Sequence, residues 1–126
     1  MRVMVLVKAT ADSEAGMKPT AETKAMFEAM GKFNQQLEEA GIIDGEAAGL
    51  KPSSAGKRVH FDGPKRSIID GPFAETKELL AGFWIWKVKD MDEAVEWVKK
   101  CPNPMLGPSD IEIRPFYELE DLAGFF

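Results

Sequence analysis

Two stretches of the chain are apolar at consecutive positions rather than at alternate ones. Residues 3–7 read Val-Met-Val-Leu-Val, and residues 79–88 contain Phe-Trp-Ile-Trp. Because side chains alternate across a strand, each stretch predicts a strand with hydrophobic residues on both faces, and such strands are normally covered on both sides. Residues 111–116 predict a last strand, in which Pro115 suits an edge or a strand end.

Two other segments carry apolar residues at the spacing of a helix face. The first is predicted to follow Thr20 as N-cap and to end at Gly41, a residue suited to a left-handed C-cap. The second, residues 91–101, follows Asp90, which with Glu93 forms a predicted capping box. The stripe expected to face the core in the first helix is Met26, Ala29, Met30, Phe33, Leu37 and Ala40.

The segment between the two helices predicts a hairpin. Residues 57–61 and 65–70 flank Asp-Gly-Pro at 62–64, a typical turn sequence. Residues 42–50 predict at most a short strand, because Gly45 and Gly49 weaken it, and residues 9–19 predict a loop.

The predicted order of strand, helix, strands, helix and strand is that of a single α+β domain over residues 1–126, with a ferredoxin-like split βαβ sheet. Two helices can cover only one face of a four- or five-stranded sheet. Since two strands are apolar on both faces, something else must cover the second face, and the simplest cover is a second copy of the same sheet. The pattern therefore predicts a homodimer that packs sheet to sheet.

Composition narrows the classes of function. The chain has 126 residues and a net charge of −5, which argues against a nucleic-acid partner or an anionic membrane held by bulk charge. The apolar start is too short to span a bilayer and lacks the features of a signal peptide, so a cytoplasmic protein is expected. No dinucleotide-binding or P-loop glycine pattern is present, and no cofactor is expected.

Single cysteine and histidine residues restrict the chemistry further. Cys101 alone excludes an internal disulfide framework and a multi-cysteine zinc site, so no metal site is predicted. Its position near a helix C-terminus disfavours the thiolate and indicates a packing residue. His60 alternates against Val59 and Phe61 and is therefore expected to face away from Asp70.

Asp70 supports the most specific chemical hypothesis. It ends the second hairpin strand, and a two-residue turn within 62–64 places it on the same side as Val59 and Ile68. A carboxylate at the end of an apolar face is partly desolvated, which favours its protonated form and suits a general acid or base. Alternatively, an Asp before Gly-Pro accepts backbone hydrogen bonds that fix a turn, and Lys57 on the same face can pair with it.

Four other residues are candidates for binding a substrate near Asp70: Phe73, Trp84, Trp86 and Arg114. The two tryptophans share one side of a predicted strand, which suits a stacking pocket but equally suits a core or a dimer interface. Arg114 can hold a substrate carboxylate with two hydrogen bonds or can form an ion pair with Glu112.

Residues 70–78, Asp-Gly-Pro-Phe-Ala-Glu-Thr-Lys-Glu, and the following 79–84, Leu-Leu-Ala-Gly-Phe-Trp, resemble the signature of the DGPF-type proteins, a branch of the YCII-related family. Similarity continues at 92–97 and 111–115. The resemblance implies a ferredoxin-like fold that dimerises into an α/β barrel, as in the muconolactone isomerase-like proteins. Asp70 is the one site residue that it carries over.

Two functions follow from these observations and the resemblance. In the first, a cofactor-independent small-molecule enzyme uses Asp70 as general acid or base at a pocket of the dimeric barrel. In the second, the same dimer binds a ligand or a partner protein without catalysis. The resemblance adds a link to extracytoplasmic-function sigma factors, beside which relatives of this branch are often encoded.

Overall fold

The computed structural model describes residues 1–126 and is built around a four-stranded antiparallel sheet. Its strand order is β2-β5-β1-β6. The connections β1-α2-β2 and β5-α3-β6 are two interleaved βαβ units, so the predicted α+β class is confirmed. The strands of this sheet are β1 (Arg2–Lys8), β2 (Ala48–Gly49), β5 (Leu80–Lys87) and β6 (Ile111–Pro115).

Both long helices begin where the sequence predicts. In α2 (Ala21–Glu39), the side chain of Thr20 accepts a hydrogen bond from the amide of Thr23 at 3.2 Å. The chain leaves this helix through Gly41 at φ +70°, a conformation that favours glycine. α3 (Met91–Lys100) starts at the predicted N-cap, but the Glu93 carboxylate accepts from Lys89 N rather than from the N-cap amide, so the predicted capping box is wrong in that detail.

One short helix was not predicted. The loop expected at 9–19 contains α1 (Ala11–Ala15), where Thr10 and Ser13 cap each other reciprocally. Sequence periodicity does not reveal a helix of five residues, because it spans little more than one turn. None of the helices is long and apolar enough to cross a membrane.

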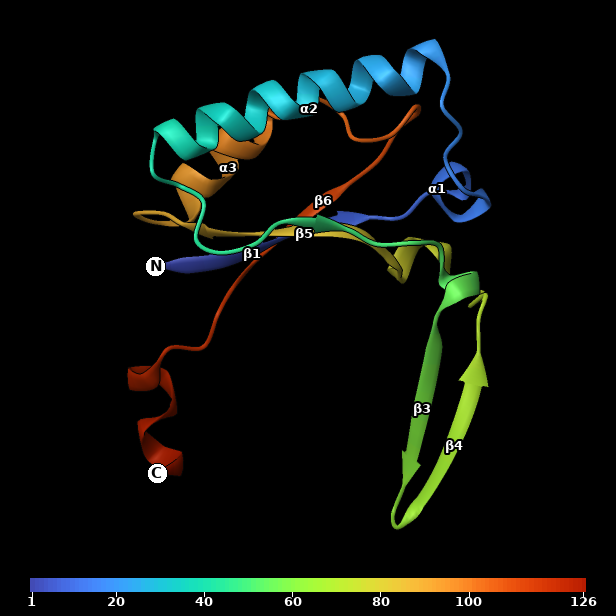
Figure 1. The fold of residues 1–126 in the computed structure, drawn as a ribbon. Helices are drawn as coiled ribbons and strands as arrows, with labels where there is room; N and C mark the ends of the chain where they lie inside the picture. The colour runs from blue at the N-terminus through green and yellow to red at the C-terminus, as the bar shows by residue number, and fades with distance from the viewer.

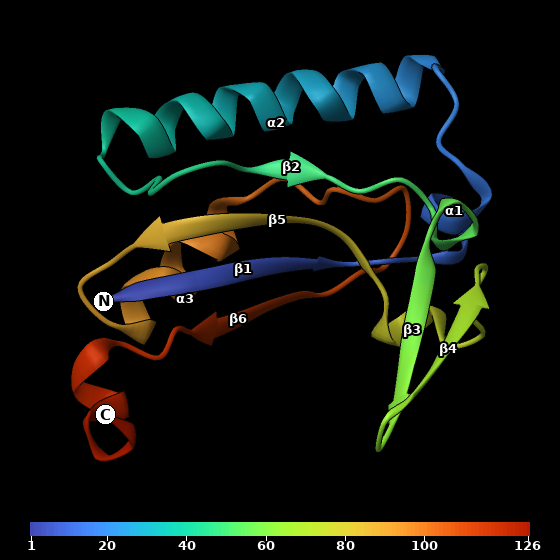
Figure 2. The same ribbon diagram turned by 60° about the horizontal axis from the view of Figure 1, so that its bottom comes forward.

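Helices α2 and α3 lie on the same face of the sheet (Figures 1 and 2). The core lies between these two layers and consists of one cluster of buried residues. Register places Trp86 opposite Val3 and Trp84 opposite Val5, so all four side chains share the helix-covered face. The buried members of the cluster are Val3, Val5, Val7, Phe33, Leu37, Ile42, Trp84, Trp86, Val88, Ala94 and Met105.

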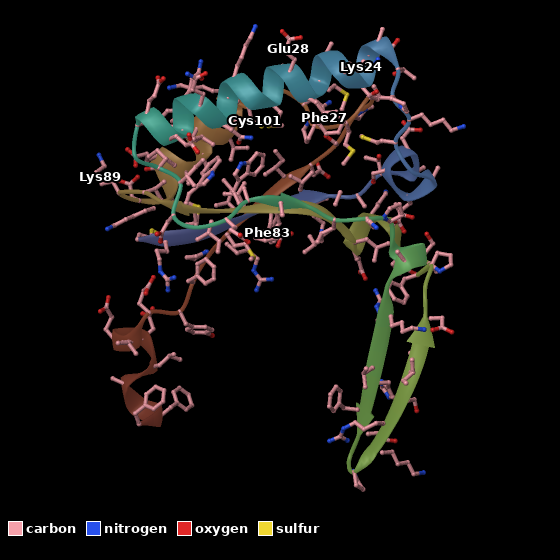
Figure 3. The ribbon with its side chains drawn as sticks, in the orientation of Figure 1. Lys24, Phe27, Glu28, Phe83, Lys89 and Cys101 are labelled. Atoms are coloured by element: carbon pink, nitrogen blue, oxygen red, sulfur yellow. The ribbon has the colours of Figure 1, made fainter.

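The second face of the sheet is uncovered, as the two-faced strands predict. Register pairs Met4 with Ile85 and Leu6 with Phe83 on this side, and we call these four residues the open face. Phe83 projects away from the helices, on the side of the sheet opposite α2 (Figure 3). No helix or strand lies over the open face in either ribbon view (Figures 1 and 2), although Leu6 is already buried by its neighbours in the same chain and the other three residues are half-buried.

The predicted hairpin forms, but outside the main sheet. β3 (Lys57–Asp62) and β4 (Lys65–Asp70) pair only with each other and make a separate two-stranded sheet. The hairpin leaves the main sheet on the side of the open face, at the end of β1 that carries Lys8 (Figure 1). At the opposite end, the C-terminal segment with its 3₁₀ turns (Leu119–Phe125) projects to the same side (Figure 1).

Candidate functional site

The motif at residues 70–73 forms the base of the hairpin. A side chain at Gly71 would place its Cβ 1.7 Å from the carbonyl oxygen of Ser53, so only glycine fits here. The amide of Gly71 donates to the carbonyl of Gly56 at 3.0 Å. The motif is therefore bound to the segment that leads into β3, and its glycine is required by close backbone approach.

Phe73 is held at the same place. Its amide donates to Ser53 Oγ at 3.1 Å, and the guanidinium of Arg58 lies 3.9 Å from the centre of its ring. Ser53 in turn donates from its hydroxyl and from its amide to the Glu14 carboxylate, the amide at 2.8 Å. We call this group of Glu14, Ser53, Arg58, Gly71 and Phe73 the hairpin clasp. It ties the hairpin to α1, and sequence reasoning missed Glu14 and Ser53 because no local pattern links them to residues 70–73.

Asp70 lies beside the clasp and is exposed. Register places it opposite Lys57, and the two side chains form an ion pair. The predicted parity holds, since Asp70 shares a face with Val59 and Ile68 while His60 lies on the other. The expected desolvation does not occur within one chain, because the Asp70 side chain is 73% exposed.

The candidate residues are not brought together within one chain. Trp86 has no exposed surface, and Trp84 is buried among Phe33 and Trp86, with the two tryptophan rings 5.8 Å apart. Phe73 belongs to the hairpin clasp. Arg114 is 72% exposed on β6, where it lies 3.9 Å from Glu112, the ion pair that the sequence offered as the alternative to substrate binding.

Arg114 borders a hollow on the side of the open face, next to the C-terminal segment. Three carboxylates share this hollow, those of Glu118, Glu120 and Asp121. Glu118 also binds Arg2 at 3.2 Å and raises the pKa of that guanidinium above its ordinary value. An acidic surrounding of this kind competes with a carboxylate substrate for Arg114.

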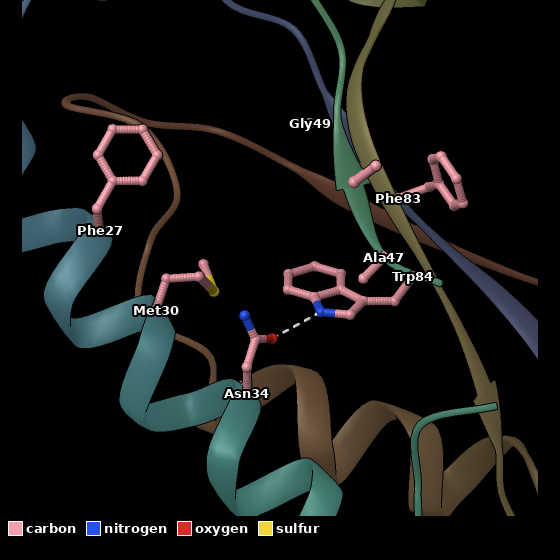
Figure 4. A pocket seen from close by; sticks show the side chains of 8 residues that line it. Phe27, Met30, Asn34, Ala47, Gly49, Phe83 and Trp84 are labelled. Atoms are coloured by element: carbon pink, nitrogen blue, oxygen red, sulfur yellow. Dashed lines mark hydrogen bonds between the residues drawn. The ribbon is translucent and has the colours of Figure 1, made fainter. Parts of the chain in front are cut away.

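A small apolar pocket, open to solvent, lies between α2 and the β2–β5 edge of the sheet, with a volume of about 220 Å³. Met30 and Asn34 project from α2 toward Trp84 of β5, and Phe27 lies at the outer edge of the pocket (Figure 4). The indole Nε1 of Trp84 donates to Asn34 Oδ1 at 2.8 Å. Gly49 and the backbone of Phe83 complete the wall, with the Phe83 ring turned to the other side of the strand (Figure 4).

Only Trp84 of this pocket was a candidate from the sequence. Phe27, Met30 and Asn34 follow one another at intervals of three and four residues, which places them on one side of the helix. A polar Asn34 within an otherwise apolar stripe is the signal that could have indicated the pocket. Of these three residues, only Met30 belongs to the stripe that helical periodicity predicts to face the core.

Other chemistry is limited. Burial raises the pKa of the Cys101 thiol to about 11. Burial therefore disfavours the reactive thiolate in addition to the helix dipole, in agreement with the predicted packing role. No three His, Cys, Asp or Glu side chains approach one another closely enough to hold a metal ion.

Comparison with known proteins places the chain in a family. It is 30% identical to an uncharacterised protein of Rhizobium meliloti (strain 1021) over 94 residues, which cover 75% of each chain. The model of the YCII-related domain matches residues 1–117, a range that includes the sheet, both long helices and the hairpin clasp. The chain therefore belongs to the YCII-related family.

Proposed function

We propose that this protein is a homodimer that binds a small molecule with an apolar or aromatic part in the pocket between α2 and β5. In the dimer, two open faces pack against each other and close an α/β barrel. The motif at residues 70–78 supports placing the chain in the DGPF branch of its family. Within one chain, the pocket between α2 and β5 supports ligand binding, whereas the exposed position of Asp70 gives less support to catalysis.

The open face supports the assembly. Its centre consists of Met4, Leu6, Phe83 and Ile85, all on the side that no helix covers. At the rim of the open face, Lys8 Nζ and Arg114 Nη1 each lie 3.9 Å from a carboxylate oxygen of Glu112. An apolar centre with a charged rim is the usual anatomy of an interface between protein subunits.

The pocket is the observation that carries the binding function. It joins three apolar side chains, those of Phe27, Met30 and Trp84, to one amide group. Asn34 accepts from Trp84 through its oxygen, which leaves its Nδ2 to donate to a ligand. Small-molecule sites typically combine an apolar wall with a few polar groups that fix orientation. The expected ligand therefore has a compact apolar ring and a hydrogen-bond acceptor such as a carbonyl oxygen.

A pair of probe compounds tests this pocket. Acetophenone supplies a ring and a carbonyl, whereas ethylbenzene supplies a ring of similar size without an acceptor. We expect acetophenone to bind more tightly and to shift the amide NMR signals of residues around Trp84. Phe27→Ala should weaken both probes, and because Phe27 is 65% exposed the fold should tolerate the change.

Lys24→Ala, on an exposed position of the same helix, is the matched control and should leave binding unchanged. Chemical-shift changes confined to another part of the molecule would refute the pocket. Equal affinity of the two probes would refute the role of Asn34 as the group that orients the ligand.

A second function is catalysis with Asp70 as general acid or base. The observation that favours it is the exposed apolar surface beside Asp70, formed by Val59, Phe61 and Ile68 on the same hairpin face. A partner that covers this surface would desolvate the Asp70 carboxylate, and a desolvated carboxylate suits a general acid or base. Phe73 lies beside this position, whereas Trp84, Trp86 and Arg114 do not.

Asp70→Asn separates this function from the first. On a substrate found by screening the wild-type dimer for turnover, the variant should lose most of its activity, since loss of a general acid or base costs roughly a hundredfold or more. Asp62→Asn, at the other end of the same hairpin, serves as control. Full turnover of Asp70→Asn would exclude the catalytic role and leave the binding function.

A further inference from the structure

Two projections leave the sheet on the side of the open face and have complementary chemistry. The first is the hairpin, residues 57–70, and the second is the C-terminal arm, which we define as residues 117–126. They stand at opposite ends of β1, the hairpin near Lys8 and the arm near Arg2 (Figures 1 and 2). The hydrogen bond from Phe116 N to the Arg2 carbonyl at 3.1 Å fixes where the arm begins.

Both projections expose large apolar side chains that nothing in their own chain covers. On the hairpin, Ile68 is 71% exposed and shares its face with Val59 and Phe61. On the arm, Phe126 is 92% exposed. The other exposed apolar residues of the arm are Tyr117, Leu119 and Phe125. Exposed apolar surface of this extent normally marks a contact with another molecule.

The charges of the two projections are opposite. The hairpin has four basic side chains and two carboxylates, and one of these, Asp70, is already paired with Lys57. Its Arg66 lies over the Phe61 ring at 4.4 Å, which puts a cation directly beside the apolar stripe. The arm has three carboxylates, Glu118, Glu120 and Asp121, of which Glu118 is already paired with Arg2, and no basic side chain.

We propose that, in the dimer, the hairpin of one copy packs against the C-terminal arm of the other. This inference rests on the proposed homodimer and adds the identity of the contacting segments. A twofold axis that brings two sheets face to face must lie between them. An axis that crosses the strands exchanges the two ends of β1, so each hairpin meets the partner's arm. An axis along the strands would bring hairpin to hairpin, where like charges repel.

Such a contact adds two equivalent interfaces to the sheet-to-sheet packing, one at each end of the barrel. Each joins an apolar stripe to exposed aromatic residues, with cations on one side and carboxylates on the other. The family match ends at residue 117, so most of the arm lies outside the matched range. The hairpin, in contrast, lies within the matched range.

Cross-linking of single-cysteine variants tests the contact. In a Cys101→Ala background, one tagged chain carries Phe61→Cys and a differently tagged chain carries Leu119→Cys, and the two are produced together. A short bismaleimide should then give a covalent dimer that contains both tags. Chains that carry Phe61→Cys alone, or Leu119→Cys alone, should give no covalent dimer. Glu28→Cys on the outer side of α2 is the matched control and should cross-link with neither position (Figure 3).

The outcomes separate this inference from the proposed function. Self-linking of the Phe61→Cys chains would show hairpin-to-hairpin contact and overturn the inference while leaving the dimer intact. Absence of every cross-link in a sample that sediments as a dimer would also overturn it. A monomer in sedimentation would overturn the proposed homodimer and the inference together. Only the mixed-tag product, in a dimeric sample, supports it.

Discussion

Cys101 follows the last residue of α3, and burial of its thiol connects protonation to stability. Its pKa is raised from 9.0 to about 11, because burial disfavours the charged thiolate. In the unfolded chain the thiol ionises near pH 9.0, whereas the folded chain keeps its proton until about pH 11. The native state therefore loses stability as the pH rises through this interval, and below pH 9.0 the thiol has no such effect.

We expect Cys101→Ala to lose less stability than the wild type between pH 9.0 and about pH 11. The difference should be about 1 kcal/mol, since the side chain is only half-buried and solvent reduces the effect. Urea unfolding of both proteins at the two pH values measures it. Parallel loss of stability in the two proteins would show that other groups cause the entire pH dependence.

The sequence predicted the surroundings of individual residues less well than it predicted the helices and strands. The parity of Asp70 and His60 on the hairpin follows from alternation and a two-residue turn, and the strand register confirms it. Exposure does not follow from alternation, because it depends on what lies above the hairpin face. The hairpin clasp was also invisible, since it joins Glu14 and Ser53 to residues far along the chain. Contacts at such separation leave no periodic signal.

Among the elements, the hairpin depends on a single close approach at its base. Gly71→Ala would place a methyl group against the Ser53 carbonyl, and backbone on both sides must move to admit it. We expect a loss of roughly 1–3 kcal/mol in the stability of the clasp. Faster hydrogen exchange of the amides of residues 71 and 73 would report it, because in the wild type the first donates to the Gly56 carbonyl and the second to Ser53 Oγ.

Gly107→Ala is the matched control for this change. A Cβ at Gly107 meets no atom within 4 Å, and the residue does not require a positive φ. Its amide exchange at the hairpin should equal that of the wild type. If Gly71→Ala left the exchange of both clasp amides unaltered, the glycine would not be required by the contact with Ser53.

Element boundaries were predictable where local chemistry decides them. Thr20 and Asp90 cap their helices as expected, because a side-chain oxygen satisfies amides that a helix start leaves free. The position of the hairpin was not predictable in the same way. Strand patterns indicate that β3 and β4 pair, but not whether the pair joins the main sheet.

At the scale of the molecule, two apolar faces on β1 and β5 correctly indicated that the helices leave one face of the sheet uncovered. That inference used only alternation and the number of helices. It did not indicate the hairpin and the arm that stand at the two ends of this face (Figure 1). Contacts of residues 53–56 position the hairpin, and contacts of residues 116–118 position the arm. The spacing of residues along the sequence does not encode such contacts.

A charge placed on the open face should disrupt the proposed dimer. Ile85→Glu places a carboxylate at its centre, opposite Met4, without entering the helix-covered core. In a homodimer with packed open faces, the twofold axis brings two such charges into one apolar contact. An unpaired buried charge costs several kcal/mol, so the dissociation constant should rise roughly a hundredfold or more. Sedimentation at micromolar concentration should then show a monomer with the circular dichroism of the wild type.

Leu106→Glu makes the same chemical change at a half-exposed position outside the open face, where it should leave the dimer intact. This control separates a specific interface from a general effect of added charge. A wild-type monomer at micromolar concentration would refute sheet-to-sheet assembly at once. A dimer that survives Ile85→Glu would instead place the interface elsewhere, and the apolar centre formed by β1 and β5 would need another cover.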